Sequence, residues 1–180
     1  IKNIKNNLKR ICCIGLILIL YSLVCHSIYT KSIVIEAKEK NYNKPTTIQK
    51  KDQIGYLKID KLNLYQPLFK KESDYNNIEE NVTILKESKM PDQDDSIVFL
   101  AAHSGSGKIA YFEELNQLSK GDTIQLNYKN KTYQYQINKI WEEEKTGYIH
   151  INKDNKKQLI LTTCSPNHQN KQLIISSILI

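Results

Sequence analysis

Short apolar segments separated by polar turns fill the chain from residue 53 to its end. Residues 54–59 (IGYLKI) and 62–69 (LNLYQPLF) alternate in polarity, which is typical of strands with one buried face. Pro67 has no backbone N–H and therefore favours an edge or an end of a sheet for the second strand. Residues 96–103 (SIVFLAAH) form a continuous apolar run, which indicates a buried strand.

A hairpin is the clearest local feature of the second half. Residues 123–128 (TIQLNY) and 131–141 (KTYQYQINKIW) flank Lys129-Asn130 and form its two arms. One face of the second arm carries three apolar side chains, those of Tyr133, Tyr135 and Ile137. The opposite face carries Gln134, Gln136 and Asn138. The hairpin therefore has one face directed to a core.

Two more strands and a helix complete the pattern. Residues 158–164 (QLILTTC) and 172–180 (QLIISSILI) predict the last two strands. Residues 109–118 (IAYFEELNQL) predict a helix that ends before Gly121, with Tyr111, Leu115 and Leu118 on one face. About seven or eight strands with one or two short helices favour a closed or nearly closed β-barrel over an alternating α/β fold.

An apolar segment precedes this domain. Residues 11–29 (ICCIGLILILYSLVCHSIY) are uncharged when His26 is neutral and have the length of a membrane-spanning helix, roughly 20 residues. The basic residues of segment 1–10 place the N-terminus in the cytoplasm. No small-x-small motif follows the run, so an uncleaved anchor is favoured over a cleaved signal peptide. We expect a single-pass membrane protein with a cytoplasmic tail (1–10), an anchor (11–29), an extracellular stalk (30–52) and an extracellular domain (53–180).

The formal net charge of +7 gives little support to a nucleic-acid partner. Four of these charges come from the tail, from Lys2, Lys5, Lys9 and Arg10. The rest of the chain is only mildly basic and has no dense block of lysine or arginine. We expect no nucleic-acid binding.

Cys164 is the candidate nucleophile. The other three cysteines, Cys12, Cys13 and Cys25, lie in the apolar segment, so the outer domain cannot form an internal disulfide. An unpaired thiol outside the cell is either buried or used. A reactive cysteine needs a nearby base or cation, because the thiolate is the nucleophile.

Three histidines of the outer domain could assist this thiol. His103 ends the apolar run at 96–103 and precedes the small residues SGSG, where a fixed side chain can face a cleft. His168 follows Cys164 in a polar loop, which holds a base less firmly. His150 has no other chemical residue beside it in the sequence and is interpreted as a surface residue. His103 is the favoured partner.

The sequence contains neither a phosphate-binding loop nor a zinc-binding motif. The segment 105–108 (GSGK) lacks the first glycine of a phosphate-binding loop, where Ala102 stands. It also lacks the hydroxyl residue that would hold magnesium, where Ile109 stands. One outer cysteine and scattered histidines cannot close a zinc site. We expect neither a cofactor nor a metal.

Residues 53–180 resemble the sortases, membrane-anchored cysteine transpeptidases of Gram-positive cell surfaces. Four motifs occur in the family's order: IGYLKIDKLNLYQPLF, FLAAH, YFEELNQLSKGDTIQL and LTTC. The resemblance implies an eight-stranded sortase barrel with Cys164 as nucleophile and His103 as its proton partner. It also implies a sorting-signal peptide of a secreted protein as substrate, and an amine of a cell-wall precursor or a pilin as acceptor.

The chain departs from the family at one important place. Sortases carry an arginine on the strand after the cysteine, where it steadies the substrate backbone and the oxyanion, but Arg10 is the single arginine of this chain. Lys171 and Gln172 are the candidates in the matching region. Lysine keeps the positive charge of arginine but lacks the planar guanidinium group that can form two hydrogen bonds at once. Glutamine has no charge but offers an amide N–H as a donor. Only one of them can face the cleft, and Gln172 is favoured.

Two milder departures are Ile160, where the family has threonine, and Ala102, where it usually has glycine. Thr163 lies on the opposite strand face from Cys164, which indicates a structural role. The alternative function is a catalytically inactive surface module that binds sorting peptides. A papain-like hydrolase is disfavoured, because its cysteine precedes its histidine in the chain.

Overall fold

The computed structural model of the protein describes residues 20–26, 51–152 and 156–180. The chain divides into two units, residues 1–45 and 46–180, and the second contains the β-rich domain. Residues 20–26 form an exposed helical segment. Among the described residues, no helix has the length and apolar character needed to cross a bilayer. The predicted tail, and most of the predicted anchor and stalk, lie outside the described residues and stay predictions.

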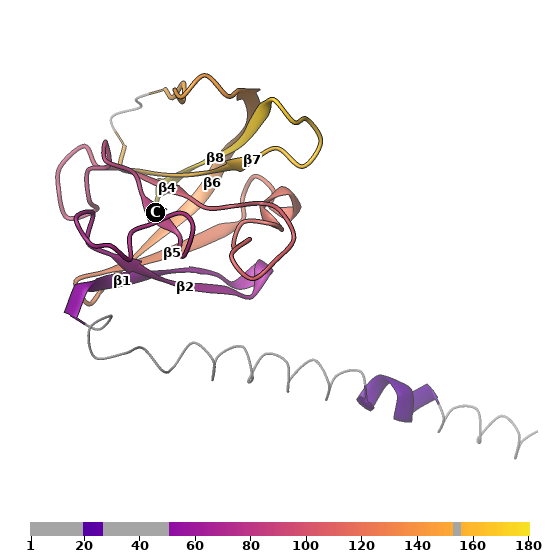
Figure 1. Ribbon diagram of the computed structural model, residues 1–180. Helices are drawn as coiled ribbons and strands as arrows, with labels where there is room; N and C mark the ends of the chain where they lie inside the picture. Colours follow the sequence, from indigo (N-terminus) through magenta and orange to yellow (C-terminus); the bar gives the residue numbers. More distant parts are fainter. Residues whose placement is uncertain (1–19, 27–50, 153–155) are drawn as a thin grey trace, which may run out of the picture. The chain divides into compact units, whose positions relative to one another are not determined.

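Eight strands form one sheet that curls into a nearly closed barrel (Figure 1). The strands are β1 (Gln53–Ile59), β2 (Leu64–Phe69), β3 (Thr83–Ile84), β4 (Ile97–Ala101), β5 (Thr123–Tyr128), β6 (Lys131–Glu144), β7 (Gln158–Cys164) and β8 (Lys171–Leu179). Their order is β2-β1-β5-β6-β8-β7-β4-β3, and the two end strands β2 and β3 approach each other. Pro67 lies on β2, an edge strand, as its missing N–H predicts. The predicted barrel is confirmed.

The β5–β6 hairpin forms where the sequence predicts it. Lys129 and Asn130 both have positive φ values, 49° and 63°, as a two-residue type I′ turn requires. Tyr133, Tyr135 and Ile137 are buried, whereas Gln134 and Gln136 are exposed. The alternation therefore sets which face of β6 contributes to the core.

The helix predicted over residues 109–118 is wrong. Only Leu115–Gln117 are helical, and they form a short 3-10 helix; a second one, Asp60–Leu62, joins β1 to β2. The buried residues of this stretch are Phe112, Leu115 and Leu118, spaced by three. Three residues per turn is the period of the 3-10 helix, whereas the predicted α-helical face used Tyr111, Leu115 and Leu118, spaced by four and three.

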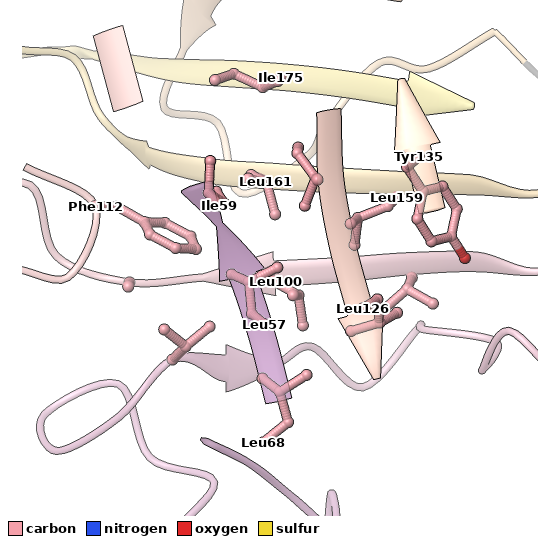
Figure 2. Packing of buried hydrophobic residues seen from close by; sticks show 14 of the residues in the cluster. Leu57, Ile59, Leu68, Leu100, Phe112, Leu126, Tyr135, Leu159, Leu161 and Ile175 are labelled. Carbon is pink, nitrogen blue, oxygen red and sulfur yellow. The ribbon is translucent and has the colours of Figure 1, made fainter. Parts of the chain in front are cut away.

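The core lies inside the barrel, where strands contribute alternate residues (Figure 2). The labelled strand residues include Leu57 of β1, Leu100 of β4, Leu126 of β5, Leu161 of β7 and Ile175 of β8. Strand β7 is buried on both faces along Gln158–Thr163 and becomes exposed only at Cys164. Its continuous apolar sequence reflects this burial of both faces. The thiol thus marks the point where β7 leaves the protein interior.

Gly55 is required by the close approach of β1 to β5. A Cβ atom at this position would lie 1.9 Å from the backbone oxygen of Asn127. We expect Gly55→Ala to lower the free energy of unfolding by about 1–3 kcal/mol, because the two strands must move apart. Gly105→Ala is the matched control, since a Cβ there meets no atom within 4 Å. Urea unfolding of both variants checks this, and equal stabilities would contradict it.

Candidate active site

The register of β4 and β7 brings His103 to the level of Cys164. The two strands are parallel, with Ala101 beside Thr162, and the Ala102 N–H extends the pairing by donating to the Thr162 carbonyl at 3.4 Å. The pairing ends there, and His103 and Cys164 each lie two residues beyond the last pair, Ala101 and Thr162. Alternation places these two side chains on the outer face of the sheet, opposite the core. The Cys164 side chain is exposed, and that of His103 is 36% exposed.

The backbone on both sides of His103 is fixed. Thr163 is buried, and its hydroxyl donates a hydrogen bond of 2.7 Å to the carbonyl of Ala102. The carbonyl of His103 accepts a 3.0 Å hydrogen bond from the N–H of Phe112, whose ring is buried in the core. Thr163 therefore has a structural role, and it ties the residue before the nucleophile to the residue before the histidine.

We expect Thr163→Val to lower the free energy of unfolding by about 1–3 kcal/mol, because valine keeps the shape but leaves the buried Ala102 carbonyl without its donor. Thr162→Val is the matched control. Thr162 is also buried, and its hydroxyl has no hydrogen-bond partner among the residues that the structure describes. Denaturant unfolding of both variants checks this. A larger loss for Thr162→Val would contradict the role given to Thr163.

Glu79 lies beside the imidazole. Its Oε1 is 3.4 Å from His103 Nε2, within ion-pair distance but without the alignment of a hydrogen bond. Glu79 is 69% exposed, so this pair contributes little to stability. The sequence does not reveal this contact, because Glu79 lies between β2 and β3 and reaches the histidine only through the fold.

Gln172 rather than Lys171 is the neighbour of Cys164. Strands β7 and β8 are antiparallel, and Cys164 pairs directly with Gln172, so their side chains share the outer face. Lys171 pairs with Glu144 and lies on the alternate face. The amide nitrogen of Gln172 donates to the Tyr148 carbonyl at 2.9 Å and to Glu143 Oε1 at 3.3 Å.

The ring of His168 is bound to Glu142. Its Nδ1 is 2.8 Å from Glu142 Oε2, and the Ser165 hydroxyl donates to Glu142 Oε1 at 2.7 Å. The bond from Ser165, and then the bond from His168, hold the pKa of Glu142 below its ordinary value. These contacts brace the β7–β8 loop that follows the nucleophile. His103 is thus the histidine that the fold brings to the level of Cys164.

His150 has a partner that the sequence did not reveal. It is exposed, as predicted, but its Nδ1 is 3.2 Å from Glu143 Oε2. The same carboxylate accepts a bond from Gln172. His150 is therefore connected through Glu143 to Gln172, the residue that pairs with Cys164.

A cavity of about 400 Å³ opens on the same face of β4 as His103. Its apolar lining comes from Ile97 and Phe99 of β4 and from Ile151. Its charged lining consists of Glu87, Lys89, Asp95 and Lys156. The outer face of this part of the sheet thus combines a hollow with an apolar floor, an exposed thiol and an imidazole.

The arrangement suits nucleophilic catalysis by cysteine with a histidine as proton carrier. No cluster of three or more histidine, cysteine or acidic side chains within the described ranges could hold a metal ion.

Comparison with known proteins supports this chemistry. A sequence model of the sortase domain matches residues 57–179. Sortase C1 of Streptococcus agalactiae is a similar solved structure, with 25% identity, a TM-score of 0.62, and coverage of 77% of this chain and 73% of the other. No curated protein sequence matches significantly.

Two further structures share the fold at lower identity. Sortase A of Corynebacterium diphtheriae (a lid mutant) has 20% identity, a TM-score of 0.59 and coverage of 71% and 69%. Sortase C of Streptococcus pneumoniae, described in connection with pilin substrate specificity, has 21% identity, a TM-score of 0.61 and coverage of 72% and 69%. The family match spans more than half of the chain and includes Cys164 and His103. The chain belongs to the sortase family of cysteine transpeptidases.

Proposed function

We propose that this protein cleaves a sorting signal near the C-terminus of secreted proteins and transfers the new acyl group to an amine. The parallel register of β4 and β7, which puts His103 level with the exposed Cys164, carries this proposal. A nucleophile and a base need fixed relative positions, and two adjacent strands of one sheet provide them.

The reaction proceeds in two steps. The thiol of Cys164 gives its proton to His103, and the sulfur attacks the scissile carbonyl carbon. The C–N bond breaks to give a thioester, and His103 passes the proton to the leaving amine. An incoming amine then attacks the thioester and gives its proton to His103, the C–S bond breaks as the amide forms, and the departing thiolate takes the proton back from His103. No oxidant or reductant is consumed.

The cavity beside Phe99 is the proposed site for the part of the peptide that precedes the scissile bond. It lies on the same face of β4 as His103, so an extended peptide can run along this face to the thiol. The acceptor is an amine of a cell-wall precursor or a pilin. The similarity to a sortase C described in connection with pilin substrate specificity favours the pilin amine. Residues 11–29 anchor the enzyme in the cell membrane, with the domain outside.

The second candidate is a surface module that binds sorting peptides without turnover. It is favoured by Gln172, which stands beside Cys164 where the family carries arginine.

Labelled peptides with sorting motifs, incubated with the protein and hydroxylamine or oligoglycine, separate the two. An enzyme forms the hydroxamate or the ligated peptide, which mass spectrometry detects. A binding module retains the peptide and returns it intact, and that result would overturn the proposed function.

A further inference from the structure

Three side chains form a row across the outer face of the barrel at its catalytic end. Cys164 of β7 pairs with Gln172 of β8, and Gln172 pairs with Glu143 of β6. Both pairings are antiparallel and direct, so the three side chains point to the same face. The row therefore joins the nucleophile to a carboxylate through one amide side chain.

The segment after β6 folds back over this row. Gly147 has a φ of 83°, a left-handed conformation that suits glycine and reverses the chain. The reversal brings the Tyr148 carbonyl to 2.9 Å from Gln172 Nε2. It also brings His150 to Glu143, which accepts a bond of 3.2 Å from the His150 N–H.

These contacts determine which way the Gln172 amide points. A carboxylate and a backbone carbonyl are acceptors only, so each must face the NH₂ end of the amide. The two N–H groups of Gln172 are satisfied by Glu143 and Tyr148. Glu143 is 16% exposed and is held by the His150 ring and by Trp141 Nε1. The free hydrogen-bonding atom of Gln172 is thus its carbonyl oxygen, which receives no bond from any residue the structure describes.

We propose that Gln172 is a hydrogen-bond acceptor for a backbone N–H of the bound peptide, and that Glu143 is the positioning residue that fixes this polarity. The family's arginine is a donor at this place, so the chemistry of the position is reversed. This inference builds on the proposed function, since the ligand is the peptide of that site. An acceptor engages the peptide in the ground state as well as in the transition state, so its loss raises KM and leaves kcat nearly unchanged.

The test uses the full chain with two variants and a matched control. Gln172→Met removes the acceptor at similar length and is expected to raise KM about two- to tenfold, the range for one hydrogen bond. Glu143→Gln keeps the shape of the side chain but allows the Gln172 amide group to rotate and exchange its oxygen and nitrogen. This variant is expected to give a smaller rise in KM. Gln134→Met, on the exposed side of β6, is the control and leaves both constants unchanged. A fall in kcat of about 10²-fold or more for Gln172→Met, with KM unchanged, would show an oxyanion donor instead and overturn the inference.

Ester-containing peptides identify the partner atom. In each peptide an ester oxygen replaces one backbone N–H outside the scissile bond, and affinities are measured in a Cys164→Ala background. One ester is expected to weaken binding, and its penalty is expected to disappear when Gln172→Met is added. Equal penalties with and without Gln172→Met at every position would overturn the inference.

Affinity is measured in a variant that cannot cleave the peptide, so the experiment tests the acceptor role of Gln172 independently of the transpeptidase activity. Binding with this coupling, but no cleavage by the unmodified protein, contradicts the transpeptidase and supports the acceptor. Cleavage without the coupling supports the transpeptidase and contradicts the acceptor. If no sorting peptide binds, both are overturned.

Discussion

Replacing Cys164 by alanine is expected to lower the rate of peptide cleavage by about 10⁴-fold or more, because no other group at the site can form the thioester. The side chain is exposed at the end of β7, so its removal leaves no cavity in the core. The thermal midpoint should therefore stay within a few degrees of the unmodified protein. Steady-state cleavage of a labelled sorting peptide, with thermal unfolding beside it, measures both.

Cys25→Ala is the matched control for this variant. Cys25 is also an exposed free cysteine, but it belongs to the N-terminal unit. Its replacement should leave cleavage unchanged. Cleavage that survives in Cys164→Ala, or disappears in Cys25→Ala, would show that the nucleophile has been misassigned.

Replacing His103 by alanine is expected to lower the rate of cleavage by about 10²- to 10⁴-fold, the contribution of a positioned general acid and base. The loss should appear in both halves of the reaction, since the same imidazole protonates the leaving amine and deprotonates the incoming one. The measurement is the rate of cleavage with and without an added amine acceptor.

His168→Ala tests the alternative base. Its ring is bound to Glu142, so its replacement should loosen the β7–β8 loop and reduce the rate by only a few-fold. A loss in His168→Ala as large as that in His103→Ala would contradict the assignment. It would mean that His168 leaves Glu142 and acts as the general acid and base for Cys164.

Much of the barrel could be predicted from the sequence because each strand carries its own signal. The β5–β6 hairpin shows two-residue alternation around a turn pair, and β7 shows the continuous apolar run of a strand buried on both faces. The α-helix predicted at residues 109–118 was wrong because the 3-10 helix and the α-helix, with 3.0 and 3.6 residues per turn, differ by less than one residue per turn. So short a segment does not distinguish the two. Strand β3, with two residues, is too short to show any period.

For the candidate site, the sequence predicts which residues take part, and their catalytic roles stay predictions. Cys164 is the last residue of β7, and His103 lies two residues beyond β4, so each follows an apolar run that is visible in the sequence. The roles of Glu79 and Glu143 were not visible, because each meets its histidine through the fold rather than through spacing. Gln172 was predicted to face Cys164 from strand alternation, but its polarity depends on Tyr148 and Glu143. That polarity is a property of tertiary contacts alone.

Mass spectrometry of the protein quenched in acid during turnover tests the central claim most directly. With a sorting peptide and no amine acceptor, the acyl fragment should be found on the proteolytic peptide that contains Cys164. The adduct should vanish on addition of hydroxylamine and be absent from His103→Ala quenched at the same time. Peptide cleavage with no adduct at Cys164, or an adduct at another residue, would contradict the account.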